Sequence, residues 1–100
     1  PLESISALIA TNTAKAFGLS DRKGRIAVGQ DADFAIIDPK AVWKVDQSKF
    51  MSSAGYSIYH DWTFTGQVIH TLVRDEFVMR EGVLIDEKIG HGRYLPRCKV

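Results

Sequence analysis

Residues 67–74 alternate side chains that would point to the two faces of a sheet, which is the pattern of a β-strand. One face would carry Val68, His70 and Leu72, and the other Ile69, Thr71 and Val73. Dipeptides that favour turns follow at residues 75–76 and 81–82, and each precedes a short apolar run. The pattern therefore predicts an antiparallel meander with strands at residues 67–74, 77–80 and 83–85.

A second apolar pattern lies upstream, in residues 23–45. Residues 34–37 contain no polar side chain, which is typical of a strand covered on both faces. Gly29 and Asp31 suit a tight turn before this strand. Pro39 is expected to end it, because proline has no N–H to donate to a neighbouring strand. Residues 42–45 alternate apolar and polar side chains and predict one more strand.

Residues 2–17 carry apolar side chains at helical spacing, so the chain is expected to begin with a helix. Thr11, Asn12 and Thr13 interrupt the pattern. Asn12 would be a good N-cap for a second short helix, and Gly18 a good residue just beyond its end. We therefore expect two short helices or one kinked helix.

Residues 46–59 mix serine, glycine and aromatic side chains without a period, which predicts a long loop. Its aromatic side chains would pack against something larger than the loop itself: Phe50, Tyr56 and Tyr59. The core of the sheet is expected to consist of Phe34, Ile36, Val68, Leu72, Phe77 and Met79.

The composition is that of one ordinary globular domain or a piece of one. The chain has 100 residues, of which 45% are hydrophobic and 25% charged, and its formal net charge is +1. Positive and negative side chains are interspersed, so the chain is expected to bind neither nucleic acid nor membrane. The one cysteine, Cys98, has no partner for an internal disulfide, which fits a reducing compartment. The first residue is Pro1 rather than Met, which favours a fragment, a processed product or a trimmed sequence.

Three stretches of the chain match one known family. Residues 23–38 fit the pattern K-G-x-I-x-x-G-x-D-A-D-x-x-x-x-D at every fixed position, residues 56–59 fit Y-x-x-Y/F, and residues 90–97 fit G-x-G-R-[FY]-[LI]-x-R. From about Leu8 to Arg97 the chain resembles the C-terminal part of a cyclic amidohydrolase, in the dihydropyrimidinase, hydantoinase and allantoinase branch of the amidohydrolase superfamily. It departs from the family at Thr13, where proline is usual, and at Asp75, where glycine is usual.

This resemblance implies a fold that is mainly β with an N-terminal helical segment. Residues 1–19 would be the last helix region of a (β/α)8 barrel, residues 20–89 the C-terminal portion of a composite β-sandwich, and residues 90–100 a C-terminal tail. The rest of the parent chain, its barrel and its N-terminal sandwich strands, would then be the partner of these residues. In the family the tail typically reaches across a subunit interface, and a homo-oligomer, a tetramer in the family, is expected.

The resemblance also implies an activity for the parent protein. It would hydrolyse the ring amide C–N bond of hydantoins, dihydropyrimidines or allantoin, in the cytoplasm, with a binuclear zinc centre held by residues upstream of this chain. The chain alone would be structural and oligomer-forming, without an active site. A rival interpretation is a fragment of a non-catalytic, dihydropyrimidinase-related assembly protein. A more remote rival is an independent β-rich binding module.

The spacing of the histidines supports the same expectation. His60, His70 and His91 lie ten and twenty-one positions apart, outside any H-x-H, H-x-x-x-H or H-E-x-x-H spacing. His70 is expected within a strand, His60-Asp61 as a surface pair rather than a base with its partner, and His91 on an exposed tail. We therefore predict no catalytic, cofactor-binding or metal-binding residue.

Other residue sets have structural interpretations beside functional ones. Asp31, Asp33 and Asp38 could suggest a cation site, but turn and strand-end positions fit them better. Gly24 and Gly29 lack the spacing of a phosphate loop. Cys98 has basic neighbours but no histidine nearby in sequence. Four aromatic side chains could stack bases but have no basic stripe beside them: Trp43, Trp62, Tyr56 and Phe64.

Overall fold

The chain folds into one curved antiparallel sheet with a helix at its N-terminus. A computed structural model describes residues 1–98. The strands lie in the order β1-β2-β3-β4, and each pairs antiparallel with the next. Their bounds are β1, Phe34–Lys44; β2, Thr63–Val73; β3, Glu76–Arg80; and β4, Val83–Leu84. The expectation of a mainly β chain with an N-terminal helical segment is confirmed.

The helix runs without a break through three segments. These are α1, Leu2–Ser6; η1, a π-helical turn at Ala7–Thr11; and α2, Asn12–Ala16. Asn12 has helical angles, φ −69° and ψ −36°, so its expected role as an N-cap is wrong. The irregularity that the sequence indicated is a π-helical turn, in which the chain adds a residue without leaving the helix. Gly18 lies just beyond the end of the helix and has φ 70°, as predicted for a glycine at this position.

Strand β1 continues through Pro39, so the prediction that Pro39 ends it is wrong. Its two halves are separated by a shift in register between Asp38 and Val42. Proline is tolerated because β1 is the edge strand of the sheet, where one side has no neighbour among residues 1–98. The Asp38 side chain accepts a hydrogen bond from the Lys40 N–H at 2.9 Å, which stabilises the local bend.

Strand β2 does not keep the strict alternation that its sequence indicated. Ile36 pairs with His70 and the next residue, Ile37, pairs with Val68, so β2 advances by two residues where β1 advances by one. A bulge of this kind changes which face the following side chains occupy. The prediction that every second residue of 68–73 lies on the same face of the sheet is therefore wrong across this bulge.

Two tight turns connect β2, β3 and β4. The first has Arg74 and Asp75 at its centre, one residue earlier than expected, and both have positive φ, 49° and 64°. Asp75 supplies unusual angles as predicted, and Arg74 supplies them too. The second turn is at Glu81 and Gly82, as predicted. After β4, the 3₁₀ turn η3, Asp86–Lys88, leads into the tail.

The buried core of the described residues is small. Leu72 was expected there and is 9% exposed, whereas Ile36 is 41% and Val68 39% exposed, so these two predictions are wrong for the chain by itself. Phe34, Phe77 and Met79 are half-buried. Ala14 and Val45 are buried although the sequence pattern did not select them.

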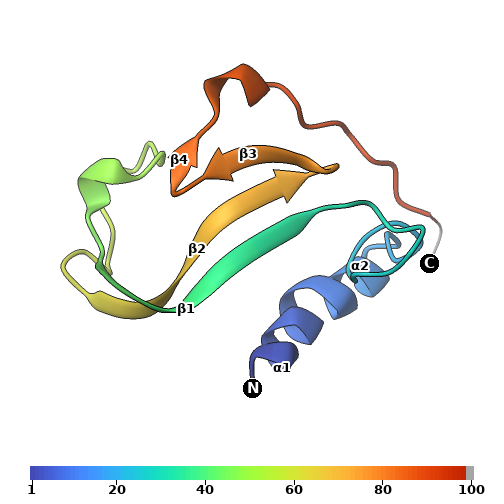
Figure 1. Cartoon of the computed structure of the whole chain (residues 1–100), viewed down its shortest axis with the longest axis horizontal. Coiled ribbons are helices and arrows are strands. Elements are labelled where there is room, and N and C mark those ends of the chain that lie inside the picture. Colours follow the sequence, from blue (N-terminus) through green and yellow to red (C-terminus); the bar gives the residue numbers. More distant parts are fainter. Residues whose placement is uncertain (99–100) are drawn as a thin grey trace.

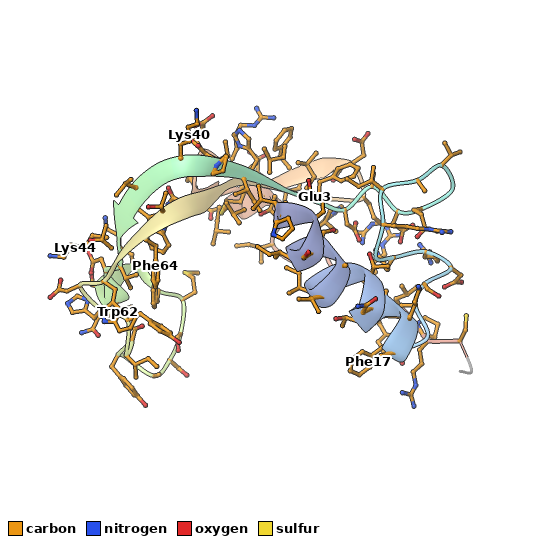
Figure 2. All side chains as sticks on the ribbon, turned by 90° about the horizontal axis from the view of Figure 1, so that it is seen from below. Glu3, Phe17, Lys40, Lys44, Trp62 and Phe64 are labelled. Carbon is orange, nitrogen blue, oxygen red and sulfur yellow. The ribbon has the colours of Figure 1, made fainter. Side chains whose placement is uncertain are left out.

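The arrangement of the parts is shown in Figures 1 and 2. The helix lies next to β1, and the loop that contains the 3₁₀ turn η2, Gln47–Lys49, lies at the other end of the molecule. Figure 2 shows the sheet curving over the helix, so that the helix occupies the concave side. Within residues 1–98 no helix is long and apolar enough to cross a membrane.

Candidate interaction face

A hollow lies between the helix and β1. It is an open groove of about 380 Å³. Its helix wall is formed mainly by apolar side chains, including Ile5 and Ile9, and its β1 wall includes Phe34 and Ile37. Ile9 is 72% exposed and Ile37 51% exposed, so this apolar surface faces solvent in the chain by itself. We call this hollow the helix–β1 groove.

Exposed apolar side chains are not confined to the groove. Large hydrophobic side chains are also exposed elsewhere on the helix and directly after it, in the loop after β1 and near the end of the chain. Examples are Leu8, Phe17, Met51, Ile58, Ile89 and Tyr94. Single exposed apolar side chains are common on a monomeric domain, but the apolar walls of the groove adjoin one another, and such patches usually mark sites that a partner covers. The sheet and helix therefore present surfaces suited to packing against further polypeptide.

An aromatic cluster occupies the end of the sheet far from the helix. Tyr59 meets Trp62 edge to face at 5.3 Å between ring centres, and Phe64 lies about 6 Å from Tyr59, Trp62 and Trp43. The Trp43 indole N–H donates to the Gly66 carbonyl at 2.9 Å. The expected loop aromatics are all partly exposed, Phe50 by 42%, Tyr59 by 46% and Tyr56 by 68%, and of the three only Tyr59 packs against the rings of this cluster.

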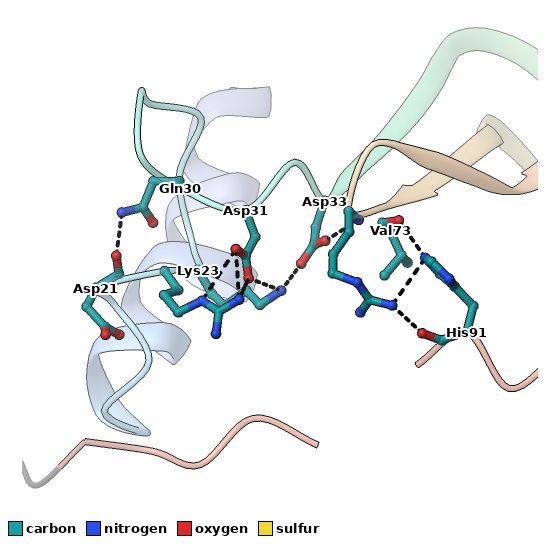
Figure 3. Close-up of polar contacts among 9 residues, drawn as sticks. Asp21, Lys23, Gln30, Asp31, Asp33, Val73 and His91 are labelled. Atoms are coloured by element: carbon teal, nitrogen blue, oxygen red, sulfur yellow. Dashed lines mark hydrogen bonds and ion pairs between the residues drawn. The ribbon is translucent and has the colours of Figure 1, made fainter. Parts of the chain in front are cut away.

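A cluster of charged side chains joins the loop after the helix to the start of β1. Arg22 and Lys23 both contact Asp31, at 3.1 Å and 2.8 Å, and Lys23 also pairs with Asp33. Asp33 in turn accepts a hydrogen bond from the Arg74 backbone N–H at 2.9 Å. Figure 3 shows these contacts as a continuous chain from the helix side to the β2–β3 turn. We call this set the polar node.

The charges of the polar node hold one another in their ionised forms. Hydrogen bonds from Lys23 and Arg22 lower the pKa of Asp31 below its usual value. Burial alone would raise the pKa of Asp33, but hydrogen bonds from Lys23 and from the Arg74 backbone outweigh burial and lower it. Burial would lower the pKa of Lys23, and its bonds to both carboxylates reverse this and raise it. Asp31 and Asp33 thus already have cationic partners.

The three histidines lie in separate environments. His60 Nδ1 accepts from the Gln47 N–H at 3.2 Å, and its other nitrogen is 3.7 Å from Asp61, with both side chains exposed. His70 lies in β2, where its Nδ1 accepts from the Glu81 N–H at 3.1 Å. His91 was expected to be exposed, which is wrong, because its side chain is only 20% exposed and lies 3.0 Å from the Val73 carbonyl.

The remaining candidates are also placed by local contacts. Asp38 was expected at a turn or strand end, which is wrong, because it lies inside β1 and pairs with Gln67. Cys98 lies exposed with its sulfur 3.6 Å from Asp21. Among residues 1–98 there is no group of three or more His, Cys, Asp or Glu side chains that could hold a metal ion. The residues of this chain therefore do not fit the binuclear zinc centre that the family resemblance implies.

Comparison with known proteins identifies the family. The sequence profile of the amidohydrolase family matches residues 1–79. The chain belongs to the amidohydrolase family. It is 40% identical over 95 residues to a dihydroorotase of Methanothermobacter thermautotrophicus, which covers 95% of this chain and 21% of that protein. It is 37% identical over 91 residues to the dihydropyrimidinase of Rattus norvegicus, covering 91% and 17%.

Solved structures support the same assignment of this amidohydrolase-family chain. A D-hydantoinase structure superposes with a TM-score of 0.79 at 35% identity, covering 83% of this chain and 18% of that one. An L-hydantoinase (dihydropyrimidinase) from Arthrobacter aurescens gives 0.80 at 36% identity, covering 84% and 19%. The chain therefore spans about a fifth of the length of the relatives it matches. Its resemblance to cyclic amidohydrolases is confirmed, and dihydroorotases join the relatives that the sequence motifs had named.

The structure explains why the amidohydrolase pattern K-G-x-I-x-x-G-x-D-A-D has its fixed residues here. Gly24 has φ 98°, and a Cβ at this position would lie 2.6 Å from the Ala14 Cβ, so only glycine allows the loop to contact the helix. The Thr11 hydroxyl donates to the Gly24 carbonyl at 2.6 Å and joins the same two segments. Lys23, Asp31 and Asp33 belong to the polar node. These three residues and Gly24 therefore attach the loop to the helix and the sheet.

Proposed function

We propose that this chain is the C-terminal structural part of a cyclic amidohydrolase, a protein that hydrolyses the ring amide C–N bond of substrates such as hydantoins or dihydropyrimidines. The relatives support this substrate class, because those compared are a dihydroorotase, a dihydropyrimidinase and hydantoinases. Allantoin is included among the proposed substrates only because the sequence motifs also resemble those of allantoinases. The chain itself contributes packing surface rather than reacting groups.

One observation carries the proposal, namely the open helix–β1 groove with its exposed apolar walls. Residues 1–98 bury only three hydrophobic side chains well, Ala14, Val45 and Leu72, which is little for 100 residues. The relatives are about five times as long as this chain, so they contain polypeptide that could cover such surfaces. In this interpretation the rest of the parent protein packs into the groove and against the outer face of the helix.

The proposal extends to the organisation of the parent. Residues 1–19 would belong to the last helix region of its barrel, residues 20–89 to a composite β-sandwich, and residues 90–100 to a tail. The tail would belong to a homo-oligomer of a cytoplasmic enzyme. The two zinc ions would be held outside this chain, since the residues described here do not form a site for them. When bound, such a centre would supply an activated water for ring opening.

The proposal is tested by comparing the full-length protein with the isolated 100 residues. The full-length protein is expected to contain zinc and to open the ring of dihydrouracil or hydantoin. The isolated chain is expected to do neither, and to self-associate at about tens of micromolar because its apolar surfaces are uncovered. Metal analysis, a ring-opening assay and light scattering after size exclusion measure these properties. Stoichiometric zinc with turnover by the isolated chain, or a stable monomer at that concentration, would overturn the proposal.

A further inference from the structure

The turn between β2 and β3 has an unusual backbone and unusual contacts. Arg74 and Asp75 both have left-handed angles, with φ 49° and 64°, and neither is glycine. A bulky side chain such as arginine rarely takes this conformation unless the surroundings hold it. Two bonds to the loop before β1 do so: Asp33 Oδ1 accepts from the Arg74 N–H at 2.9 Å, and the Ala32 carbonyl accepts from the Asp75 N–H at 2.9 Å.

The side chain of Arg74 reaches in the other direction, to the tail. Its Nη2 donates to the His91 carbonyl and lies 3.3 Å from His91 Nε2, which is itself 3.0 Å from the Val73 carbonyl. These contacts direct the Arg74 guanidinium at His91, which Figure 3 shows beside Val73. Lys88 pairs with Glu76 at 2.8 Å and joins η3, which precedes the tail, to β3. The strained turn is therefore held from both the loop and the tail.

The other end of the tail returns to the helix. The Cys98 N–H donates to the Gly18 carbonyl at 2.8 Å, and the Cys98 sulfur lies 3.6 Å from an Asp21 carboxylate oxygen. Figure 1 shows the tail running from β4 along the outside of the molecule to the end of α2. A segment with contacts at both ends joins the sheet to the helix by a route separate from the loop of residues 17–33.

We propose that residues 90–98 form an intrachain strap, fastened at Arg74 and anchored at Gly18, which holds the helix and the β2–β3 turn in fixed relation. The left-handed turn presents the Arg74 side chain to His91, and the strap would in turn favour that turn conformation. By holding the α2 end of the helix, the strap would also limit how far the helix–β1 groove can open. This inference concerns contacts within the chain and stands whether or not the parent is an enzyme.

A pair of matched glycine variants tests the fastening at Arg74. Arg74→Gly removes the guanidinium and relieves the left-handed strain, whereas Glu81→Gly relieves similar strain, φ 50°, at a turn residue with a 79% exposed side chain. Hydrogen exchange of the full-length protein would be followed in peptides that cover residues 90–98. We expect exchange in the tail about fivefold to tenfold faster for Arg74→Gly, and within about twofold of the unaltered protein for Glu81→Gly. Equal exchange in the two variants would overturn the strap.

A cross-link tests the anchor independently of any loss of stability. In an Asp21→Cys variant of the full-length protein, a mild oxidant would remove two electrons and two protons from the new thiol and Cys98 to form a disulfide. The strap predicts that this bond forms within one chain, seen as an unchanged molecular mass under non-reducing conditions and as a cross-linked peptide pair by mass spectrometry. A covalent dimer through these two cysteines would show that the tail crosses to another subunit, and the absence of any bond would show that it leaves Gly18. Either result would overturn the proposal.

Discussion

The helix–β1 groove and the polar node share the loop between the helix and β1, but only the polar node has all its partners within the chain. In the polar node each charged group has an oppositely charged neighbour within the chain, and Lys23 alone contacts both Asp31 and Asp33. In the groove, apolar side chains such as Ile9 face solvent. The difference indicates that the contacts between loop, helix and turn are complete within these residues, whereas burial of the helix depends on polypeptide beyond them.

The largest effect is expected where the loop touches the helix. Gly24→Ala would place a Cβ 2.6 Å from that of Ala14 and would also force an L-residue into φ 98°. We expect a loss of about 3 kcal/mol in the free energy of unfolding of the full-length protein, measured by urea titration. Gly29→Ala is the matched control, since φ there is 89° but nothing lies within 4 Å of the added Cβ, and it should lose only about 1 kcal/mol. Equal losses would show that the close contact is unimportant.

A charge placed in the groove tests whether further polypeptide covers the groove, which the polar node does not need. Ile9→Asp is expected to destabilise the full-length protein by about 2–3 kcal/mol, because a carboxylate would be buried where the rest of the protein covers the groove. In the isolated chain the same change should reduce self-association, since it interrupts an exposed apolar surface. Ser4→Asp, on the same helix, is the control and should change both properties little. If Ile9→Asp leaves the full-length protein unaffected, the groove is not an internal contact.

An intermediate effect is expected at Asp33, which connects the polar node to the β2–β3 turn. Asp33→Asn removes the ion pair with Lys23 and weakens the bond from the Arg74 N–H, so we expect a loss of about 1–2 kcal/mol near neutral pH. The pKa of Asp33 is lowered on folding, so its stabilisation is complete above the unfolded value of about 4 and is lost as the pH falls through the lower folded value.

Acid unfolding measures this pH dependence. The unaltered protein should lose stability more steeply below about pH 4 than Asp33→Asn does, because the variant has one fewer carboxylate that must take up a proton. Parallel acid-unfolding curves would show that Asp33 is not held in its ionised form by the polar node.

The smallest effect is expected at the exposed pair of Lys44 and Asp61. The two side chains are 65% and 66% exposed, and their charged atoms are 3.3 Å apart. Lys44→Gln should change the free energy of unfolding by less than about 0.5 kcal/mol, and the change should vanish in high salt. A loss comparable to that of Asp33→Asn would mean that charge pairs contribute equally throughout the chain, which would remove the distinction drawn for the polar node.

Local features of the fold were predictable where short-range chemistry decides them. The glycine after the helix, the Glu81-Gly82 turn and a strand at residues 34–37 follow from backbone preferences and side-chain patterns, and the structure has all three. The expectation that this strand is covered on both faces is wrong for the described residues, since Ile36 and Ile37 are exposed. Pro39 was misjudged because the sequence does not show that β1 is an edge strand, where a missing N–H costs little. Ile36 and Val68 were assigned to the core because apolar character does not say which polypeptide will cover a side chain.

The contacts of the polar node were also predictable only where they are local in sequence. The polar node could be foreseen only in part, because Asp31 and Asp33 were correctly given turn and strand-end positions while their cationic partners and the Arg74 N–H were not identified. Contacts over such sequence separations depend on tertiary structure, which a single sequence does not provide. A signal for the role of Arg74 was nevertheless present, since a hairpin without glycine at residues 74–75 requires something to hold its angles.

The π-helical turn at Ala7–Thr11 sets the rotational phase of the first helical turns. In an α-helix each residue turns the chain by about 100°, so deleting one residue from this segment would restore regular geometry and swing every preceding side chain around the axis by roughly that angle. Leu2 and Ile5, which now line the groove, would then point elsewhere, while Ala14 would keep its place against Gly24. A single-residue deletion there would thus leave the C-terminal half of the helix seated and misalign the N-terminal half with whatever it docks against.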